Sequence, residues 1–267
     1  MPRWSLLLLS MLLLSHSALA GQRDFVILQP GAPATEEEAR PYLRLLFDYL
    51  DAKVGGGKFS GAFFGEVEPG LSYIKTTRPG YGFVSIGIYL KHGKAMRMTP
   101  LAQLVFDGKQ EGPYHIMVRK ARYGSLDELK GKQLAGAILF EPELFFGHGL
   151  EGKYSAKDFE LIPTTRTLRY LRKVAKDKTD AIVLDQRAHQ GLHKIKLKAE
   201  LVAIHQTAAI PHPLFVAFEG LAPKTERARM QDALAGLCRD EAGKKVCQNF
   251  EFDDFAKVGA KDLPAAR

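Results

Sequence analysis

The chain has 267 residues, which is enough for one large domain or two smaller ones. Hydrophobic residues make up 46% of it and charged residues 25%, and these values exclude collagen-like, low-complexity and wholly disordered chains. The formal net charge of +8 is the one unusual value in the composition.

The first 20 residues predict a secretory signal peptide. A single cation, Arg3, precedes an apolar run over residues 6–14, and Ala18-Leu19-Ala20 forms a small-x-small cleavage site before Gly21. The apolar run is too short and wrongly flanked for a membrane span. We therefore expect an exported mature protein that begins at Gly21 and carries a net charge of +7, because cleavage removes only Arg3.

The two cysteines fit an exported protein. Cys238 and Cys247 lie nine residues apart, with a polar, Gly-containing turn expected between them. In an oxidising compartment this spacing predicts a disulfide that closes a short loop. Two free thiols or half of a metal site are the poorer interpretations, because no second Cys pair or close His pair flanks the two positions.

Strands and helices alternate in the first third of the chain. Thr35-x-x-Glu38 resembles a capping box at the start of an amphipathic helix, and residues 66–74 predict a short connecting helix. Buried strands are expected at residues 25–28, 59–64 and 81–84. This alternation predicts a parallel sheet covered on both faces.

The alternation is interrupted in the middle of the chain and then resumes. Ser125-x-x-Glu128 forms a second capping-box pattern, which opens a one-turn helix that Gly131 stops. A helix is expected from about Thr167. The strands expected here cover residues 96–106, 114–118, 133–140, 159–163 and 181–184.

The last third predicts two more strands and two helices. Residues 195–203 alternate apolar and charged side chains, a pattern typical of a half-exposed strand. Residues 214–218 predict a buried strand, and residues 224–237 and 250–258 predict helices. This completes a second unit of alternating strands and helices.

The order of these segments resembles the periplasmic substrate-binding proteins of ABC transporters, in particular the branch that binds phosphate, phosphite and phosphonate. The resemblance spans nearly the whole mature chain and rests on four strings of residues, SLDELKGK at 125–132, YGFVS at 81–85, TDAIVLD at 179–185 and IPHPLFVA at 210–217. It implies an α/β fold of two Rossmann-like lobes joined by two hinge crossings, as in type 2 periplasmic binding proteins. Lobe I would comprise residues 21–112 and 208–267, and lobe II residues 113–207.

The same resemblance implies a function and partners. It implies a periplasmic monomer that is not an enzyme, needs no cofactor, and binds a small molecule for a membrane permease. On the expected division, lobe II carries 17 basic and 11 acidic residues, and lobe I 20 and 19. Either this excess is a solvated basic face around Lys194, Lys196 and Lys198, or it is a field that favours an anionic ligand.

One segment departs from the family pattern. The phosphonate binders resembled here have a Ser-Thr-Ser run at a helix N-terminus, whereas this chain has FEPELFFGHG at residues 140–149. Two carboxylates and two aromatic rings are poor partners for a phosphoryl group, because anion sites use free N–H groups and neutral or cationic donors. We therefore do not expect the phosphonate specificity to carry over.

Candidate ligand contacts follow the strands, because ligands of open α/β sheets bind beyond the carboxyl ends of the strands. Thr164, Thr165 and Arg166 place two hydroxyls and a guanidinium at an expected helix N-terminus, which favours an anion. Alternatively, one Thr only caps that helix. The positions that this rule selects are Gln29, Glu66, Ser85, Glu141, Thr164, Thr165, Arg166 and Asp185.

The family resemblance adds further candidates. Asp185 matches an acidic position that contacts the ligand, although it could instead pair with Arg187. Ser85, followed by Tyr89, matches the position where a loop of lobe I meets the ligand, with a surface turn as the alternative. Two roles are open for Tyr81, Phe145 and Phe146, namely an aromatic wall of the ligand site or packing in the core.

Other classes of site fit less well. His189 and His193 have helical i,i+4 spacing, but the Gly191 between them weakens a helix, and no metal site is expected. Aromatic residues are not interleaved with the basic ones, which argues against nucleic acid. The hypothesis is an exported solute-binding protein with a small anionic or zwitterionic ligand. The alternatives are a ligand-sensing partner of a membrane-bound receptor and, less favoured, an enzyme that uses Glu141 or Asp185 as acid or base.

Overall fold

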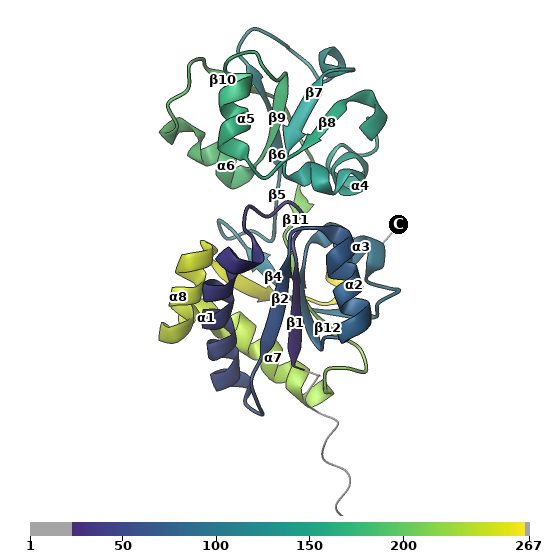
Figure 1. Cartoon of the computed structure of the whole chain (residues 1–267), viewed down its shortest axis with the longest axis vertical. Coiled ribbons are helices and arrows are strands. Elements are labelled where there is room, and N and C mark those ends of the chain that lie inside the picture. Colours follow the sequence, from purple (N-terminus) through teal and green to yellow (C-terminus); the bar gives the residue numbers. More distant parts are fainter. Residues whose placement is uncertain (1–22, 265–267) are drawn as a thin grey trace, which may run out of the picture.

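The structure is a computed structural model that describes residues 23–264 as two α/β lobes, one above the other in Figure 1. The expected signal peptide lies outside the described residues. Among the described residues, no helix has the length and apolar character needed to cross a membrane.

Lobe I contains a six-stranded mixed sheet with the strand order β13-β4-β12-β3-β1-β2. Strand β1 pairs in parallel with β2 and β3, while β12 runs antiparallel to both β3 and β4. The strands are β1 (Asp24–Leu28), β2 (Ser60–Phe64), β3 (Tyr81–Val84), β4 (Met98–Val105), β12 (Leu214–Phe218) and β13 (Asp254–Lys257).

Helices cover both faces of this sheet. In Figure 1, α1 and α8 lie on one side of the sheet and α2 and α3 on the other. The expected capping box starts α1, because the Thr35 hydroxyl accepts from the Glu38 N–H at 3.3 Å and Glu38 accepts from the Thr35 N–H at 2.8 Å. The helices are α1 (Glu36–Val54), α2 (Val67–Thr77), α3 (Ile86–His92), α7 (Lys224–Gly236) and α8 (Glu241–Phe250).

Lobe II contains a five-stranded sheet with the order β10-β6-β9-β7-β8. Strand β7 pairs in parallel with β8 and β9, and β6 runs antiparallel to β9 and β10. The elements are β6 (Tyr114–Arg119), β7 (Gln133–Gly136), β8 (Glu160–Pro163), β9 (Ala181–Asp185), β10 (Leu201–Gln206), α4 (Pro142–Leu144), α5 (Thr167–Val174) and α6 (Gln186–Gly191).

Two chain crossings join the lobes. They pair with each other as the short antiparallel strands β5 (Glu111–Gly112) and β11 (Ile210–Pro211), which lie between the two sheets in Figure 1. The expected α/β fold with two lobes and two crossings is therefore confirmed.

The structure corrects three segments. The strand expected to run to residue 140 ends at Gly136, and residues 138–140 form a turn of 3₁₀ helix. The strand expected over 195–203 begins only at Leu201, which pairs with Arg119 at the end of its partner β6. Residues 254–257 form strand β13 instead of a helix, because Phe255 enters the core against Phe215, with ring centroids 5.0 Å apart.

Two smaller differences concern helix starts. Helix α3, which begins at Ile86 shortly after β3, was not predicted from the sequence. The one-turn helix expected after Ser125 is present at Asp127–Leu129, but Leu126 occupies its N-cap position without a side-chain hydrogen bond. Ser125 only donates its hydroxyl to Glu128 at 3.4 Å, so this pattern is not a capping box.

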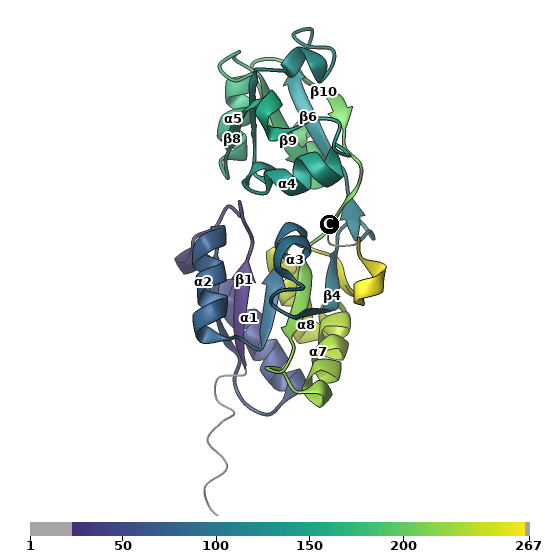
Figure 2. The ribbon, with the colours of Figure 1, turned by 90° about the vertical axis from the view of Figure 1, so that its right-hand side faces the viewer.

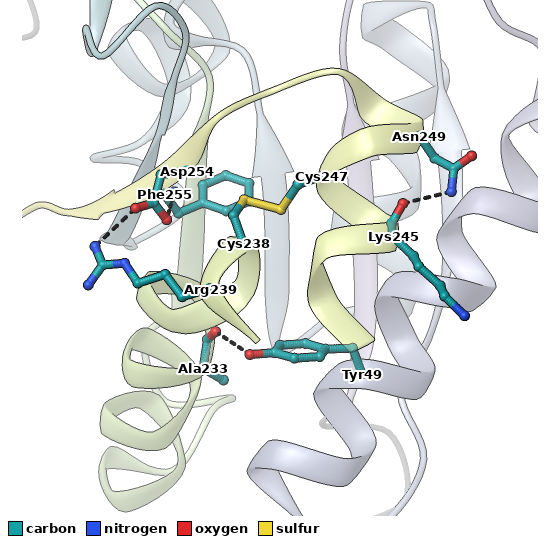
Figure 3. Close-up of a disulfide and its surroundings, with 9 residues drawn as sticks. All are labelled: Tyr49, Ala233, Cys238, Arg239, Lys245, Cys247, Asn249, Asp254 and Phe255. Atoms are coloured by element: carbon teal, nitrogen blue, oxygen red, sulfur yellow. Dashed lines mark hydrogen bonds and ion pairs between the residues drawn. A yellow bond between two sulfur atoms is a disulfide. The ribbon is translucent and has the colours of Figure 1, made fainter. Parts of the chain in front are cut away.

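The expected disulfide between Cys238 and Cys247 is present, with the two Cα atoms 5.7 Å apart (Figure 3). The segment that it closes is not the expected turn, because helix α8 begins at Glu241 and the Asp240 side chain caps it by accepting from the Ala242 N–H at 3.0 Å. The bridge thus fixes α8 to the end of α7. A hydrogen bond of 3.0 Å from the Tyr49 hydroxyl to the Ala233 carbonyl ties α7 to α1.

Candidate ligand-binding cleft

A cavity of about 360 Å³ lies between the two lobes. Its walls come from the segments after β1 and β3 in lobe I, from the segments after β7 and β9 in lobe II, and from residues near both crossings. This volume falls in the range of small-molecule sites. The polar side chains in the walls belong to Gln29, Ser85, Tyr114, Glu141, Thr167 and Asp185.

Four of the residues selected from the sequence line this cavity, namely Gln29, Ser85, Glu141 and Asp185. Gln29 and Ser85 directly follow β1 and β3, Asp185 ends β9, and Glu141 follows the 3₁₀ turn after β7. The topology of the two sheets thus brings them together from positions up to 156 residues apart in the chain. In Figure 2, α4 lies directly above α3. Ser85 is the N-cap of α3 and Glu141 the N-cap of α4, and the two side chains meet between the lobes. The cavity is therefore formed by both lobes together.

Ser85 and Glu141 form a hydrogen bond between the lobes. The Ser85 hydroxyl donates to Oε1 of Glu141 at 2.7 Å and accepts from the backbone N–H of Ile88 at 3.2 Å, which caps α3. Burial raises the pKa of the Glu141 carboxyl to about 7, although the hydrogen bonds from Ser85 and from the Ile88 backbone act in the opposite direction. Glu141 therefore changes its charge near neutral pH.

The second carboxylate of the cavity, Asp185, ends β9. Its Oδ1 accepts from the Ala188 N–H at 2.7 Å, so it caps α6 while it faces the cavity. Arg187 does not pair with it, because the Arg187 guanidinium bonds to Glu251 in lobe I. The nearby Tyr114 hydroxyl has a raised pKa because it is buried and because Asp185 and Glu141 are close.

Gln29 carries an unused donor in the cleft. Its backbone N–H donates to the Phe64 carbonyl at 3.0 Å, which fixes the end of β1. Its side-chain Nε2 is buried and has no hydrogen-bond partner in the part of the chain that the structure describes. A buried donor without a partner destabilises a protein, and Gln29 lines the cavity, so a ligand acceptor would satisfy it.

Three aromatic candidates lie outside the cavity walls. Tyr81 is fully buried in lobe I, where its hydroxyl donates to Glu226 at 2.9 Å. Phe145 is fully buried in lobe II beside Phe146, with ring centroids 5.1 Å apart. Tyr89 lines a separate cavity of about 310 Å³ on lobe I. Tyr81 and Phe145 are therefore core residues in this structure.

The run Thr164-Thr165-Arg166 lies at the edge of the site. Thr164 is buried, and its hydroxyl accepts from the Arg166 N–H at 3.1 Å. The side chain of Arg166 is exposed and does not line the cavity, whereas the next residue, Thr167, does. The run is thus adjacent to the cleft without forming its wall.

Several cavity residues had not been selected from the sequence. Pro30 and Gly31 form the turn after β1, and Gly31 has a φ of +78°. A Cβ atom on Gly31 would lie 2.7 Å from the carbonyl oxygen of Ala137, so glycine is needed where the lobes approach each other. The Pro-Gly pair was visible as a turn signal, but only the structure shows that the turn meets lobe II.

The charge of the cavity is acidic. Its walls hold the carboxyl groups of Glu141 and Asp185, and no lysine, arginine or histidine within residues 23–264 lines it. The excess positive charge of lobe II lies elsewhere, for example on the exposed Arg169 and Arg172 of α5. Its position favours the interpretation as a solvated face over a field inside the cleft.

No metal cluster is found within residues 23–264, where no group of three or more His, Cys, Asp or Glu side chains could hold an ion. His189 stacks on His115, with ring centroids 3.8 Å apart, and the Nε2 atom of His115 bonds to Gln186 at 2.7 Å. Within residues 23–264, His189 and His193 therefore do not belong to a group of three side chains that could bind a metal ion.

Two α/β lobes, two crossings and a cavity between the lobes define a type 2 periplasmic binding protein. Residues 82–263 match the sequence profile of a family described as the periplasmic substrate-binding protein of the phosphonate ABC transporter. The chain belongs to this family of phosphonate-binding periplasmic proteins, and family membership places it in the periplasm. A search among curated proteins gave no match.

Solved structures share the fold at low sequence identity. A Xanthomonas citri protein bound to ATP has a TM-score of 0.71 and 16% identity, with 90% of this chain and 92% of that chain covered. PhnD1 from Prochlorococcus marinus in complex with methylphosphonate has a TM-score of 0.66 and 14% identity, with coverages of 90% and 94%. A binding protein component of a Pseudomonas aeruginosa ABC phosphonate transporter has a TM-score of 0.67 and 12% identity, with coverages of 90% and 82%.

Proposed function

We propose that this protein captures a small zwitterionic molecule between its lobes and presents the closed, loaded form to the permease of an ABC transporter. The observation that carries the proposal is the cavity of about 360 Å³, which is lined by two carboxyl groups and by Gln29, whose buried Nε2 has no hydrogen-bond partner within residues 23–264. We propose a carrier and not an enzyme, because the family to which the chain belongs consists of substrate-binding proteins.

The two ends of the ligand find different partners in this cavity. An ammonium group suits Asp185, and Glu141 when its carboxyl group is deprotonated, since a buried cation needs an opposite charge. An anionic end suits Gln29 Nε2 and the run Thr164-Thr165-Arg166 beside Thr167, which supply neutral and cationic donors. A purely anionic ligand would leave both carboxyl groups facing like charge, so we rank zwitterions above simple phosphonates.

Closure would occur at the two crossings. The proposed lobe boundaries at 112/113 and 207/208 adjoin the pairing of Gly112 with Ile210, and a hinge there would move two rigid sheets against each other. A permease can then distinguish the loaded form by its closed shape, because the ligand shifts the balance between open and closed lobes. We propose a monomer that a cleaved signal peptide, residues 1–20, directs to the periplasm. A role as a partner of a sensor receptor is the second candidate.

Thermal-shift and calorimetric titrations test the ligand class, because a ligand that binds only the folded state raises its melting temperature. The panel comprises aminoalkylphosphonates and amino acids as zwitterions, methylphosphonate and phosphate as anions, and alkylamines as cations. We expect a zwitterion to raise the melting temperature. Its affinity should fall at least tenfold in Asp185→Asn and should also be weaker in Arg166→Ala. Tight binding of phosphate or methylphosphonate with no response to amines or zwitterions would refute the proposal.

A further inference from the structure

The segment that departs from the family pattern makes the central contact between the lobes. Glu141 extends from the start of α4 in lobe II to the start of α3 in lobe I, where Ser85 donates to it at 2.7 Å. A Cβ atom on Gly87 would collide with this carboxylate, so the backbone of α3 is bare at the point of contact. The carboxyl group thus sits directly on the first turn of α3.

Beside one crossing, the Ala208 N–H donates to the Gly149 carbonyl at 3.0 Å and His148 Nε2 bonds to the Ala209 carbonyl at 3.1 Å. Away from the crossings, two ion pairs within residues 23–264 also join the lobes, and both lie in solvent. Lys91 pairs with Glu143 at 2.8 Å, and Arg187 pairs with Glu251. Ion pairs between exposed side chains contribute little, because water screens them and ordering long side chains costs entropy. The contact of Glu141 with Ser85 is formed in the cavity itself, where a hydrogen bond is stronger than in water.

We propose that Glu141 is a built-in latch between the lobes, whose carboxyl group accepts from lobe I and lets the lobes close without an anionic ligand. The latch holds best when its carboxyl group is protonated, because the neutral acid still accepts from Ser85 through its carbonyl oxygen and costs less to bury than the carboxylate. Deprotonation therefore loosens the closed form. The latch does not depend on the identity of the ligand, and its test uses ligand-free protein.

Few other ionisable groups face Glu141. Inside the cavity these are Asp185 and Tyr114, and the Tyr114 hydroxyl remains neutral because burial and both carboxyl groups raise its pKa. On the α3 side, Lys91 is engaged by Glu143 in solvent, and burial lowers the pKa of His92 next to it. Two histidines lie near the crossings, where His148 bonds to the Ala209 carbonyl at 3.1 Å and His212 to the Leu104 carbonyl at 3.3 Å. The part of the pH response that Glu141→Gln removes is therefore the part assigned to Glu141.

The size of the response follows from linkage. In the open form Glu141 is in water and has the ordinary pKa of a glutamate, about 4.5, whereas in the closed form the pKa is about 7. The ratio of closed to open molecules should then fall by roughly 70-fold between pH 5 and pH 8, because protonation and closure favour each other. Removal of the hydrogen bond by Ser85→Ala should lower this ratio by roughly tenfold at any pH.

Single-molecule energy transfer between dyes on Lys75→Cys of α2 and Lys157→Cys of lobe II measures the ratio directly, since both positions are exposed. We expect wild-type protein to open as the pH rises from 5 to 8. Glu141→Gln keeps the acceptor without the charge and should remain closed at both pH values. Glu141→Ala should be open at both, and the matched variant Glu143→Gln should behave as wild type.

Circular dichroism and melting temperature confirm for each variant that both lobes are folded. Equal closed fractions of wild type and Glu141→Ala at pH 5 would overturn the latch. A pH response as large in Glu141→Gln as in wild type would overturn the role of Glu141 protonation. Both results would leave the zwitterion proposal standing, because ligand titration and ligand-free closure are separate measurements.

Discussion

The charged cluster at the bottom of lobe I offers a sharp test of the fold. Arg23 and Glu226 are buried, with 9% and 7% of their surfaces exposed, and form an ion pair between the residue before β1 and the first turn of α7. Glu226 also accepts from the Tyr81 hydroxyl at 2.9 Å. Replacing Glu226 with Gln removes the only carboxylate that the structure places against the Arg23 guanidinium within residues 23–264.

The expected cost can be set from the remaining contacts. Breaking a buried pair costs about 3–5 kcal/mol because an unpaired charge is left behind. Arg23 keeps its bonds to the carbonyl oxygens of Gly55 and Gly57, so we expect the lower end, about 3 kcal/mol. For a chain of this size that loss lowers the melting temperature by about 10 °C.

Urea unfolding and thermal melts measure this loss. Tyr81→Phe is a graded control, since it removes one hydrogen bond and should cost about 1 kcal/mol. Lys244→Gln is a surface control, because it breaks the exposed pair with Glu241 and should change stability by less than about 0.5 kcal/mol. If Glu226→Gln costs no more than the surface control, the account of a buried pair that stabilises lobe I is wrong.

Three further predictions concern the disulfide, the lobe contact and pH. Cys238→Ser with Cys247→Ser should lower the free energy of unfolding by about 2.5 kcal/mol, the chain-entropy value for so short a loop, as measured by denaturant unfolding. Gly31→Ala should weaken ligand binding in calorimetry much more than Gly108→Ala, because both glycines have positive φ but only Gly31 meets the other lobe; equal effects would contradict this. Because burial raises the pKa of Glu141 to about 7, the native protein binds a proton that the unfolded chain has released. The free energy of unfolding should therefore fall as pH rises from 5 to 8, by on the order of 3 kcal/mol more in wild type than in Glu141→Gln, as measured by denaturant titrations of both proteins. The same pH dependence in both proteins would contradict this.

Local sequence patterns predicted much of the fold. The capping box of Thr35 and Glu38 depends on four neighbouring residues, and the apolar runs of the central strands identify themselves, so both were predictable. The start of β10 at Leu201 was not, because it depends on pairing with Arg119 at the end of the distant β6. The strand at Phe255 was also not predictable, because its segment forms a strand only through pairing with the distant β4. The sequence alone indicated a helix there.

The cleft was predictable where a general rule applied and not where side chains act across lobes. Strand ends directed attention to Ser85, Glu141 and Asp185, which line the cavity. The same rule also selected Arg166, whose side chain points to solvent, because a strand end fixes a position and not a side-chain direction. The unpartnered amide of Gln29 depends on packing by both lobes, and no sequence pattern contains that information.

The order of strands in lobe I has a consequence for the order of folding. Strand β12 lies between β3 and β4 at the centre of the sheet, yet it follows them by about a hundred residues in the chain, and β13 at the edge comes later still. This sheet cannot be completed until residues 214–218 are available, whereas the sheet of lobe II comes from one continuous segment. Lobe I therefore depends on pairing between distant parts of the chain, and the Cys238–Cys247 disulfide lies in the last of these parts.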